Sequence, residues 1–251
     1  VKSVSKDNYL VGEVWEDASN KISYGYRRRF LRGRQLDSVM NYPFANAIVD
    51  FLKGADGNYL INTVLDITEN YPPQALRLLM NHIGTHDTAR ILTRLGSNES
   101  FDGDRERQSR ATLSAEQYSY AVKLLKLAAV LQYTLPGVPS LYYGDEAGLT
   151  GYGDPFCRAT YPWGNENAEL LAFYKELGAV RNGAKAFVSG EFVPYECENG
   201  FVSYMRKNGK NTVFIAVNRG NETVCTELPK EFQGVTKAFG VKPQNGNITL
   251  S

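Results

Sequence analysis

The amino-acid sequence predicts an α/β fold followed by an all-β region. Over the first 183 residues, apolar runs typical of strands covered on both faces alternate with helical patterns, and short strands with Gly and Asn turns follow. Polar residues gather after the apolar runs, as they do at the rim of a (β/α)8 TIM barrel. We therefore predict half of such a barrel over residues 1–183, and an antiparallel β-sandwich domain without its last strand over residues 184–251.

The half barrel is predicted from the following elements. Its parallel strands are the runs that are hydrophobic throughout, at residues 9–15, 38–42, 80–84 and 137–143. Helical periodicity supplies the crossovers, at residues 43–52, 59–69, 73–79 and 115–133. Ser114 and Gln117 in capping-box spacing mark the start of the last helix, and Pro136-Gly137 follows its end. A closed barrel needs about 200 residues or more, so four strand units before residue 183 indicate half a barrel.

The all-β region begins after a helix predicted over residues 169–180. Its strands are expected at residues 191–195, 201–206, 212–217 and 222–228. Asn208-Gly209 lies between two of them, and this residue pair favours a type I′ hairpin turn. The change of pattern predicts a domain boundary near Ala184.

The net charge and the composition indicate which kinds of binding partner the chain is suited to. The chain has 28 basic and 27 acidic residues, a net charge of +1, so no nucleic acid and no anionic membrane is indicated, and a neutral substrate fits better. The arginine cluster over residues 27–34 has no interleaved aromatic stacking motif and is interpreted as ion-paired or solvated. The longest apolar stretch, residues 124–135, is too short to span a bilayer. Three widely spaced cysteines predict free thiols and favour a cytoplasmic over a secreted protein.

Acidic residues follow three of the predicted strands. Glu13 stands between apolar neighbours and close to Trp15, and burial there would raise its pKa and make it a proton donor. Asp87 follows the third strand and Asp145-Glu146 the fourth. Two carboxylic acids on either side of one bond are what glycoside hydrolysis requires. The alternative for Glu13 is a carboxylate held by an arginine. For Asp145-Glu146 the favoured interpretation is a pair that holds the rim together by hydrogen bonds, and contact with a ligand is the alternative.

Two further segments carry polar side chains that could bind a ligand. His86 beside Asp87 is suited to donate a hydrogen bond to a substrate hydroxyl, whereas His82 is expected to be a hydrogen-bonded core residue; a metal site built on the two histidines is the competing interpretation. The Gly-rich loop over residues 151–164 combines aromatic rings with Asp154 and Arg158, a surface to which sugars bind. An ordinary loop with a surface ion pair is the alternative.

Three ordered motifs resemble those of α-amylase superfamily glycoside hydrolases of the neopullulanase or cyclomaltodextrinase type. Leu10-Val-Gly-Glu-Val-Trp15 resembles the fifth-strand motif, Met80–Arg90 the seventh-strand motif, and Pro136–Glu146 the eighth strand. The resemblance covers essentially the whole chain and implies barrel strands five to eight. The roles it implies are acid/base catalysis by Glu13, transition-state stabilisation by Asp87, and substrate binding by His86, Trp15, Arg90, Asp154 and Arg158.

The chain departs from this family at the catalytic nucleophile. The family nucleophile is an Asp in a Gly-x-Arg-x-Asp motif, which is absent here. We therefore expect an α-glucan hydrolase as the intact protein and no activity from this chain alone. A glucanotransferase and a non-catalytic carbohydrate-binding or interaction module are the alternatives. No cofactor is expected within the chain, calcium use by the intact protein is left open, and the exposed edges of a half barrel predict self-association.

Overall fold

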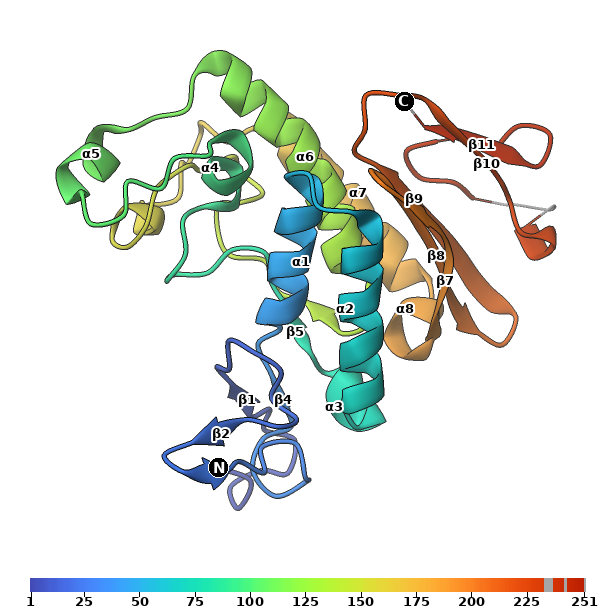
Figure 1. Ribbon diagram of the computed structural model, residues 1–251, viewed down its shortest axis with the longest axis horizontal. Coiled ribbons are helices and arrows are strands. Elements are labelled where there is room, and N and C mark those ends of the chain that lie inside the picture. Colours follow the sequence, from blue (N-terminus) through green and yellow to red (C-terminus); the bar gives the residue numbers. More distant parts are fainter. Residues whose placement is uncertain (233–236, 242, 251) are drawn as a thin grey trace.

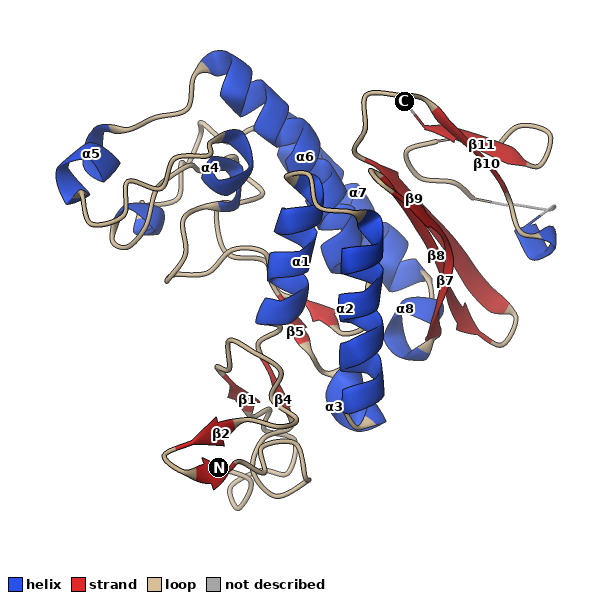
Figure 2. Cartoon of the chain, in the orientation of Figure 1, coloured by secondary structure: helices blue, strands red, loops and turns tan. Residues whose placement is uncertain are grey.

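The computed structural model describes residues 1–232, 237–241 and 243–250. Helices form the centre of the molecule, a small β-rich segment at the N-terminus lies below them in the view, and an antiparallel sheet lies along their right side (Figure 1, Figure 2). Among the described residues, no helix has both the length and the apolar character needed to cross a membrane.

Four very short strands form a parallel array. They are β1 (Val11–Gly12), β4 (Ser38–Val39), β5 (Met80–Asn81) and β6 (Val138–Pro139). β1 pairs with β4 and β5 pairs with β6, both in parallel, and a parallel bridge between Met40 and Met80 joins the two pairs. The predicted strand positions are therefore confirmed, but each ladder is two residues long. The described residues form no closed barrel.

Side-chain amides inside the molecule hold this array together. The Asn41 side-chain amide donates to the Asn81 side-chain oxygen at 2.8 Å, and the Asn81 amide donates to the carbonyl of Pro136 at 2.8 Å. Gln132 donates to the carbonyls of Asn81 and Ser140 at 3.0 and 2.9 Å. Buried polar groups need such partners, and these bonds fix the strand ends where the pairing between strands is short.

The predicted helices are present, with boundaries within a few residues of those expected. They are α1 (Tyr42–Leu52), α2 (Gly57–Asn70), α3 (Pro73–Arg77), α6 (Ala115–Thr134) and α7 (Ala168–Gly183). The capping box at Ser114 and Gln117 is formed. Sequence periodicity missed three short helices and one hairpin: α4 (Ile91–Gly96), α5 (Arg105–Arg110), α8 (Ala186–Ser189), and β2 (Ile22–Ser23) paired with β3 (Tyr26–Arg27). Single 3-10 turns occur at η1 (Phe156–Arg158) and η2 (Lys230–Phe232).

The C-terminal region contains two antiparallel sheets. One has the order β7 (Glu191–Glu198), β8 (Phe201–Asn208) and β9 (Asn211–Asn218), and the other pairs β10 (Val224–Glu227) with β11 (Asn247–Leu250). The predicted type I′ turn is wrong, because Asn208 belongs to β8 and the two turn residues are Gly209 and Lys210, of which Gly209 alone has a positive φ, 57°. Type I′ requires a positive φ at both central residues.

One continuous apolar core joins the helices to the larger sheet. It contains Leu60 and Val64 of α2 together with Val202 and Tyr204 of β8, all fully buried. The contact is close at the start of α2, where the backbone N–H of Gly57 donates to the carbonyl of Asn199 at 2.8 Å. The sheet therefore packs directly on α2, as Figure 1 shows.

Candidate functional site

The predicted site residues lie beyond the carboxyl ends of the parallel strands. Glu13 directly follows β1, Tyr42 is three residues after β4, and His86 and Asp87 follow β5. The loop that carries Arg158 follows β6. Because the ends of parallel strands meet at one edge of a sheet, segments distant in the sequence converge there.

Glu13 is exposed, which corrects the prediction that apolar neighbours bury it. Alternate residues of an extended chain point to opposite sides, so Val14 is buried while Glu13 and Trp15 face outward. One carboxylate oxygen, Oε1, accepts hydrogen bonds from the Trp15 indole N–H and from the Tyr42 hydroxyl, both at 3.2 Å. The other oxygen, Oε2, accepts no hydrogen bond from the residues that the structure describes.

Tyr42 is a site residue that sequence reasoning missed. Its ring is 2% exposed, stacks on Trp15 with centroids 4.1 Å apart, and meets His82 edge-on at 4.4 Å. Burial raises the pKa of Tyr42 to about 12; a hydrogen bond with Thr85 works against this, and the negative charges of Glu13 and Asp87 add to it. Tyr42 therefore stays protonated as a donor, within electrostatic reach of both predicted catalytic carboxylates. A hydroxyl-bearing ring just after a strand was the signal available in the sequence.

The structure brings together four predicted residues from two loops. Asp87 Oδ2 lies 3.3 Å from His86 Nε2, and Asp87 Oδ1 lies 3.2 Å from Arg158 Nη2. Arg158 Nε also pairs with Asp154 at 2.7 Å and donates to the carbonyl of His86 at 3.0 Å. These groups are partly exposed, so their ion pairs contribute little to stability. They present carboxylate, imidazole and guanidinium groups at the surface, where hydroxyls of a ligand can reach them.

Arg90 does not belong to this exposed surface. The prediction that it binds substrate conflicts with its position, because the side chain is 0% exposed. Its Nε donates to the carbonyl of Cys157 at 2.6 Å, and its Nη1 donates to the carbonyl of Tyr143 and to Asp145 Oδ1, the latter at 3.2 Å. Arg90 therefore ties the loop that carries Arg158 to the end of β6.

Asp145 has the structural role that was favoured from the sequence. It is 0% exposed and forms a buried ion pair with Arg90. Burial raises the pKa of Asp145 to about 7, while the charge of Arg90 lowers it. Asp145 Oδ2 and one oxygen of Glu146, Oε2, have no hydrogen-bond partner among the described residues. Asp145 is therefore closed to a ligand, and its ion pair with Arg90 joins the segments that follow β5 and β6.

His82 is buried as predicted, but it is not fully hydrogen-bonded. Its Nε2 has no partner among the described residues. Burial, and then the positive charge of Arg94, lower the pKa of His82 to about 4, so the ring is neutral near pH 7. Over the part of the chain that the structure describes, no group of three or more His, Cys, Asp or Glu side chains is arranged to hold a metal ion.

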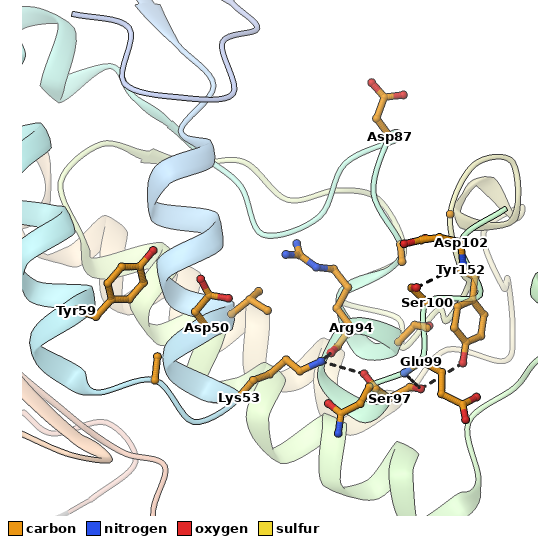
Figure 3. A pocket seen from close by; sticks show the side chains of 16 residues that line it. Asp50, Lys53, Tyr59, Asp87, Arg94, Ser97, Glu99, Ser100, Asp102 and Tyr152 are labelled. Atoms are coloured by element: carbon orange, nitrogen blue, oxygen red, sulfur yellow. Dashed lines mark hydrogen bonds between the residues drawn. The ribbon is translucent and has the colours of Figure 1, made fainter. Parts of the chain in front are cut away.

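A cavity of about 800 Å³ begins at Asp87 and runs between α1 and the segment after α4 (Figure 3). Its walls carry charged and hydroxyl-bearing side chains, among them Asp50, Arg94 and Tyr59. Cavities of this volume are typical of small-molecule sites.

Comparison with known proteins identifies the family. The family model "Alpha amylase, catalytic domain" matches residues 1–168. The chain belongs to the alpha-amylase catalytic domain family. It is 33% identical to a cyclomaltodextrinase of Geobacillus thermopakistaniensis over 240 residues, which are 93% of this chain and 35% of that protein. It is 35% identical to an amylopullulanase of Thermoanaerobacter thermohydrosulfuricus over 244 residues, 88% of this chain and 15% of the relative.

Solved structures of the alpha-amylase family agree with this assignment. The chain aligns over its whole length with the cyclic alpha-maltosyl-(1→6)-maltose hydrolase of Arthrobacter globiformis in complex with maltose, with a TM-score of 0.76 and 26% identity, covering 49% of that chain. A cyclomaltodextrinase structure aligns with a TM-score of 0.74 and 29% identity, and 39% of that chain is covered. The fold is therefore that of the alpha-amylase superfamily, a TIM barrel with a C-terminal β domain, of which this chain spans half or less.

Proposed function

We propose that the intact protein containing this chain is a retaining hydrolase that cleaves α-1,4 or α-1,6 glucosidic bonds of starch-like α-glucans. The observation that carries this proposal is the hydrogen bond from the Tyr42 hydroxyl to Glu13, at a place where the negative charge of Asp87 also raises the pKa of Tyr42. Relatives named cyclomaltodextrinase and amylopullulanase support the substrate class.

The chemistry assigned to these residues follows from their hydrogen bonds. Because Oε1 of Glu13 accepts bonds from Trp15 and Tyr42, the acid proton belongs on Oε2, from which it passes to the glycosidic oxygen of the leaving sugar. The Asp87 carboxylate stabilises the positive charge that develops on the sugar ring, and His86 donates to a hydroxyl of the same sugar. As the glycosidic bond breaks, the sugar is transferred to the nucleophilic carboxylate, which the rest of the intact protein would supply. Glu13, now deprotonated, then removes a proton from the water that cleaves this sugar–enzyme bond, and the nucleophilic carboxylate is released.

The same proposal assigns substrate contacts to Asp154 and Arg158. Arg158 spans Asp87 and Asp154, so a sugar that displaces or bridges these ion pairs would be held next to the cleaved bond. This cluster is the binding surface for the non-reducing part of the glucan, while Trp15, at the leaving-group side, is 49% exposed and offers its ring to the next sugar.

We infer that the chain alone is inactive. Retention requires a nucleophilic carboxylate about 5 Å from the acid, and the sequence contains no Gly-x-Arg-x-Asp motif. In this proposal residues 1–183 are the second half of a barrel, with β1 and β6 as its open edges, and residues 184–251 a C-terminal sandwich. Open edges favour pairing with a second copy, which light scattering at increasing concentration would detect. A strictly monomeric chain would contradict it.

The proposal is tested by assays of this chain and of the intact protein on pullulan and cyclodextrins. We expect turnover by the intact protein only. In the intact protein, Glu13→Gln and Asp87→Asn should each remove most of kcat and leave substrate binding nearly unchanged, because both keep the shape of the side chain and remove its proton chemistry or charge. Near-normal turnover by either variant, or hydrolysis by this chain alone, would contradict the assigned roles.

A further inference from the structure

The cavity that begins at Asp87 is formed by this chain alone. One wall is α1 with the start of α2, which supply Asp50, Lys53 and Tyr59, and the other is α4 with the following loop. Asp87 and Lys53 are both among the lining residues, and in Figure 3 the Asp87 carboxylate points away from the other side chains of the lining. Both walls are made by residues between positions 49 and 153 of this chain.

Lys53 fixes the position of the α4 wall. Its Nζ donates to the carbonyls of Arg94 and Ser97, at 3.0 and 3.1 Å, where the last turn of α4 leaves carbonyl groups unpaired. Burial, and then the charge of Arg94, lower the pKa of Lys53, with Asp50 opposing them. The charge of Lys53 is thus used within the protein, and the two walls are held at a defined separation.

Arg94 points into the space between the walls (Figure 3). Its guanidinium forms no hydrogen bond or ion pair with the residues that the structure describes, although burial lowers its pKa. Asp50 faces it from α1, close enough to oppose that lowering but without a direct ion pair. A partly buried guanidinium with five N–H donors and a facing carboxylate are therefore both free to bind a ligand placed between them.

The chemistry of the walls favours a polyhydroxylated ligand over an anion. Asp50, Asp87, Glu99 and Asp102 outnumber the two cations of the lining, so an anion would meet net repulsion. Adjacent hydroxyls of a sugar can donate to the Asp50 carboxylate and accept from Arg94 at the same time. The ring of Tyr59, 48% exposed at the edge of the cavity, offers an apolar face to the same sugar.

We propose that this groove is an additional binding site for α-glucan, continuous with the proposed cleavage site at Asp87, in which Asp50 and Arg94 bind vicinal hydroxyls of one glucosyl unit. The inference rests on the proposed function for the choice of sugar.

The test is the affinity of this 251-residue chain for maltotriose, measured by isothermal titration calorimetry with inorganic phosphate as the anionic comparison. Arg94→Met and Asp50→Asn are each expected to weaken maltotriose binding by about tenfold or more, the loss expected for a hydrogen bond to a charged group. Arg94→Lys should lie between Met and Arg, because it keeps the charge and loses the planar fork. Arg110→Met is the matched control, since Arg110 lies on exposed α5 and pairs only with Glu106.

Three outcomes would overturn the inference. If Arg94→Met and Asp50→Asn bind maltotriose as the unaltered chain does, the groove is not the site, and the proposed hydrolase function stands independently. If phosphate binds and competes with maltotriose, the site prefers anionic ligands. If the unaltered chain binds no maltotriose, the groove does not bind glucan, and turnover by the intact protein on pullulan separately decides the proposed function. Circular dichroism and melting temperature of each variant distinguish lost binding from lost folding.

Discussion

Replacement of Arg90 by Met is expected to lower the free energy of unfolding by about 3–5 kcal/mol, the usual effect of removing one partner of a buried ion pair. Arg90 and Asp145 are both 0% exposed, so water cannot replace the lost partner. The carbonyls of Cys157 and Tyr143 lose their donors as well. Met has nearly the length of the aliphatic part of Arg, so little cavity is left. The loss of the charged group is therefore the main contribution to the change in the free energy of unfolding. The change corresponds to a melting temperature lower by about 6–20 °C.

The effect should depend on pH in a defined direction. In the wild type, burial already raises the pKa of Asp145 to about 7, and Arg90 limits this rise. Removal of Arg90 lifts that limit, so in the folded variant the carboxyl stays protonated to a higher pH than in the folded wild type. The folded variant then binds a proton that the unfolded variant does not, and its stability falls as pH rises. Urea unfolding should accordingly give a larger cost for Arg90→Met at pH 8 than at pH 5.

A double-mutant cycle with Asp145→Asn measures the coupling directly. The double variant should cost less than the sum of the single variants, by about 1 kcal/mol or more, because Asp145→Asn removes the buried carboxyl group that Arg90→Met leaves without its partner. Arg110→Met, in an exposed pair, should change stability by no more than about 0.5 kcal/mol. A cost below about 1 kcal/mol for Arg90→Met, or additive single costs, would refute the assigned role of the buried pair.

Three further predictions, one of them with a matched comparison variant, test other parts of the fold by urea unfolding. His82→Gln should remove a pH dependence of up to about 3 kcal/mol between pH 7 and pH 4, because the unfolded ring takes up a proton near pH 6.5 and the folded one near pH 4, so wild-type stability falls as pH falls. Gly57→Ala should cost about 1–3 kcal/mol, since its Cβ would lie 2.6 Å from Val202 Cγ1, whereas Gly178→Ala has open space and should stabilise α7. Ser114→Ala should cost about 1 kcal/mol through loss of the cap.

Each of these predictions has an outcome that would contradict it. Equal pH slopes for wild type and His82→Gln would mean that the ring is not held neutral. An unchanged free energy of unfolding for Gly57→Ala would show that β8 moves to make room for the added methyl group. An unchanged midpoint for Ser114→Ala would mean that water replaces the cap.

The sequence correctly predicted those features that depend on residues close together in the chain. Ser114 and Gln117 are three residues apart, and the helix they cap has the predicted start. The α4 helix escaped prediction because six residues give too little periodicity, and because it is held by Lys53, which is distant in sequence. Strand length was overestimated since apolar runs report burial, whereas a ladder also requires partners in register.

The sequence predicted which residues form the site better than it predicted how their side chains are placed. His86, Asp87, Asp154 and Arg158 meet as expected, because loops after adjacent parallel strands converge. The exposure of Glu13 could not be read from its apolar neighbours, since exposure depends on which side of the strand is covered. The burial of Arg90 could not be predicted from its neighbours in the sequence either, because its hydrogen-bond partners lie about fifty to seventy residues further along the chain.

The direct packing of β8 on α2 has a consequence for how this architecture can change over evolutionary time. Gly57 leaves no room for a side chain, and the facing surface is made by Val202, Cys197 and the backbone of Phe201. A β module taken from another protein by recombination would have to match this contour as well as the point of chain fusion. The barrel segment and the sheet are therefore expected to be inherited together, with compensating substitutions on the two sides of their shared surface.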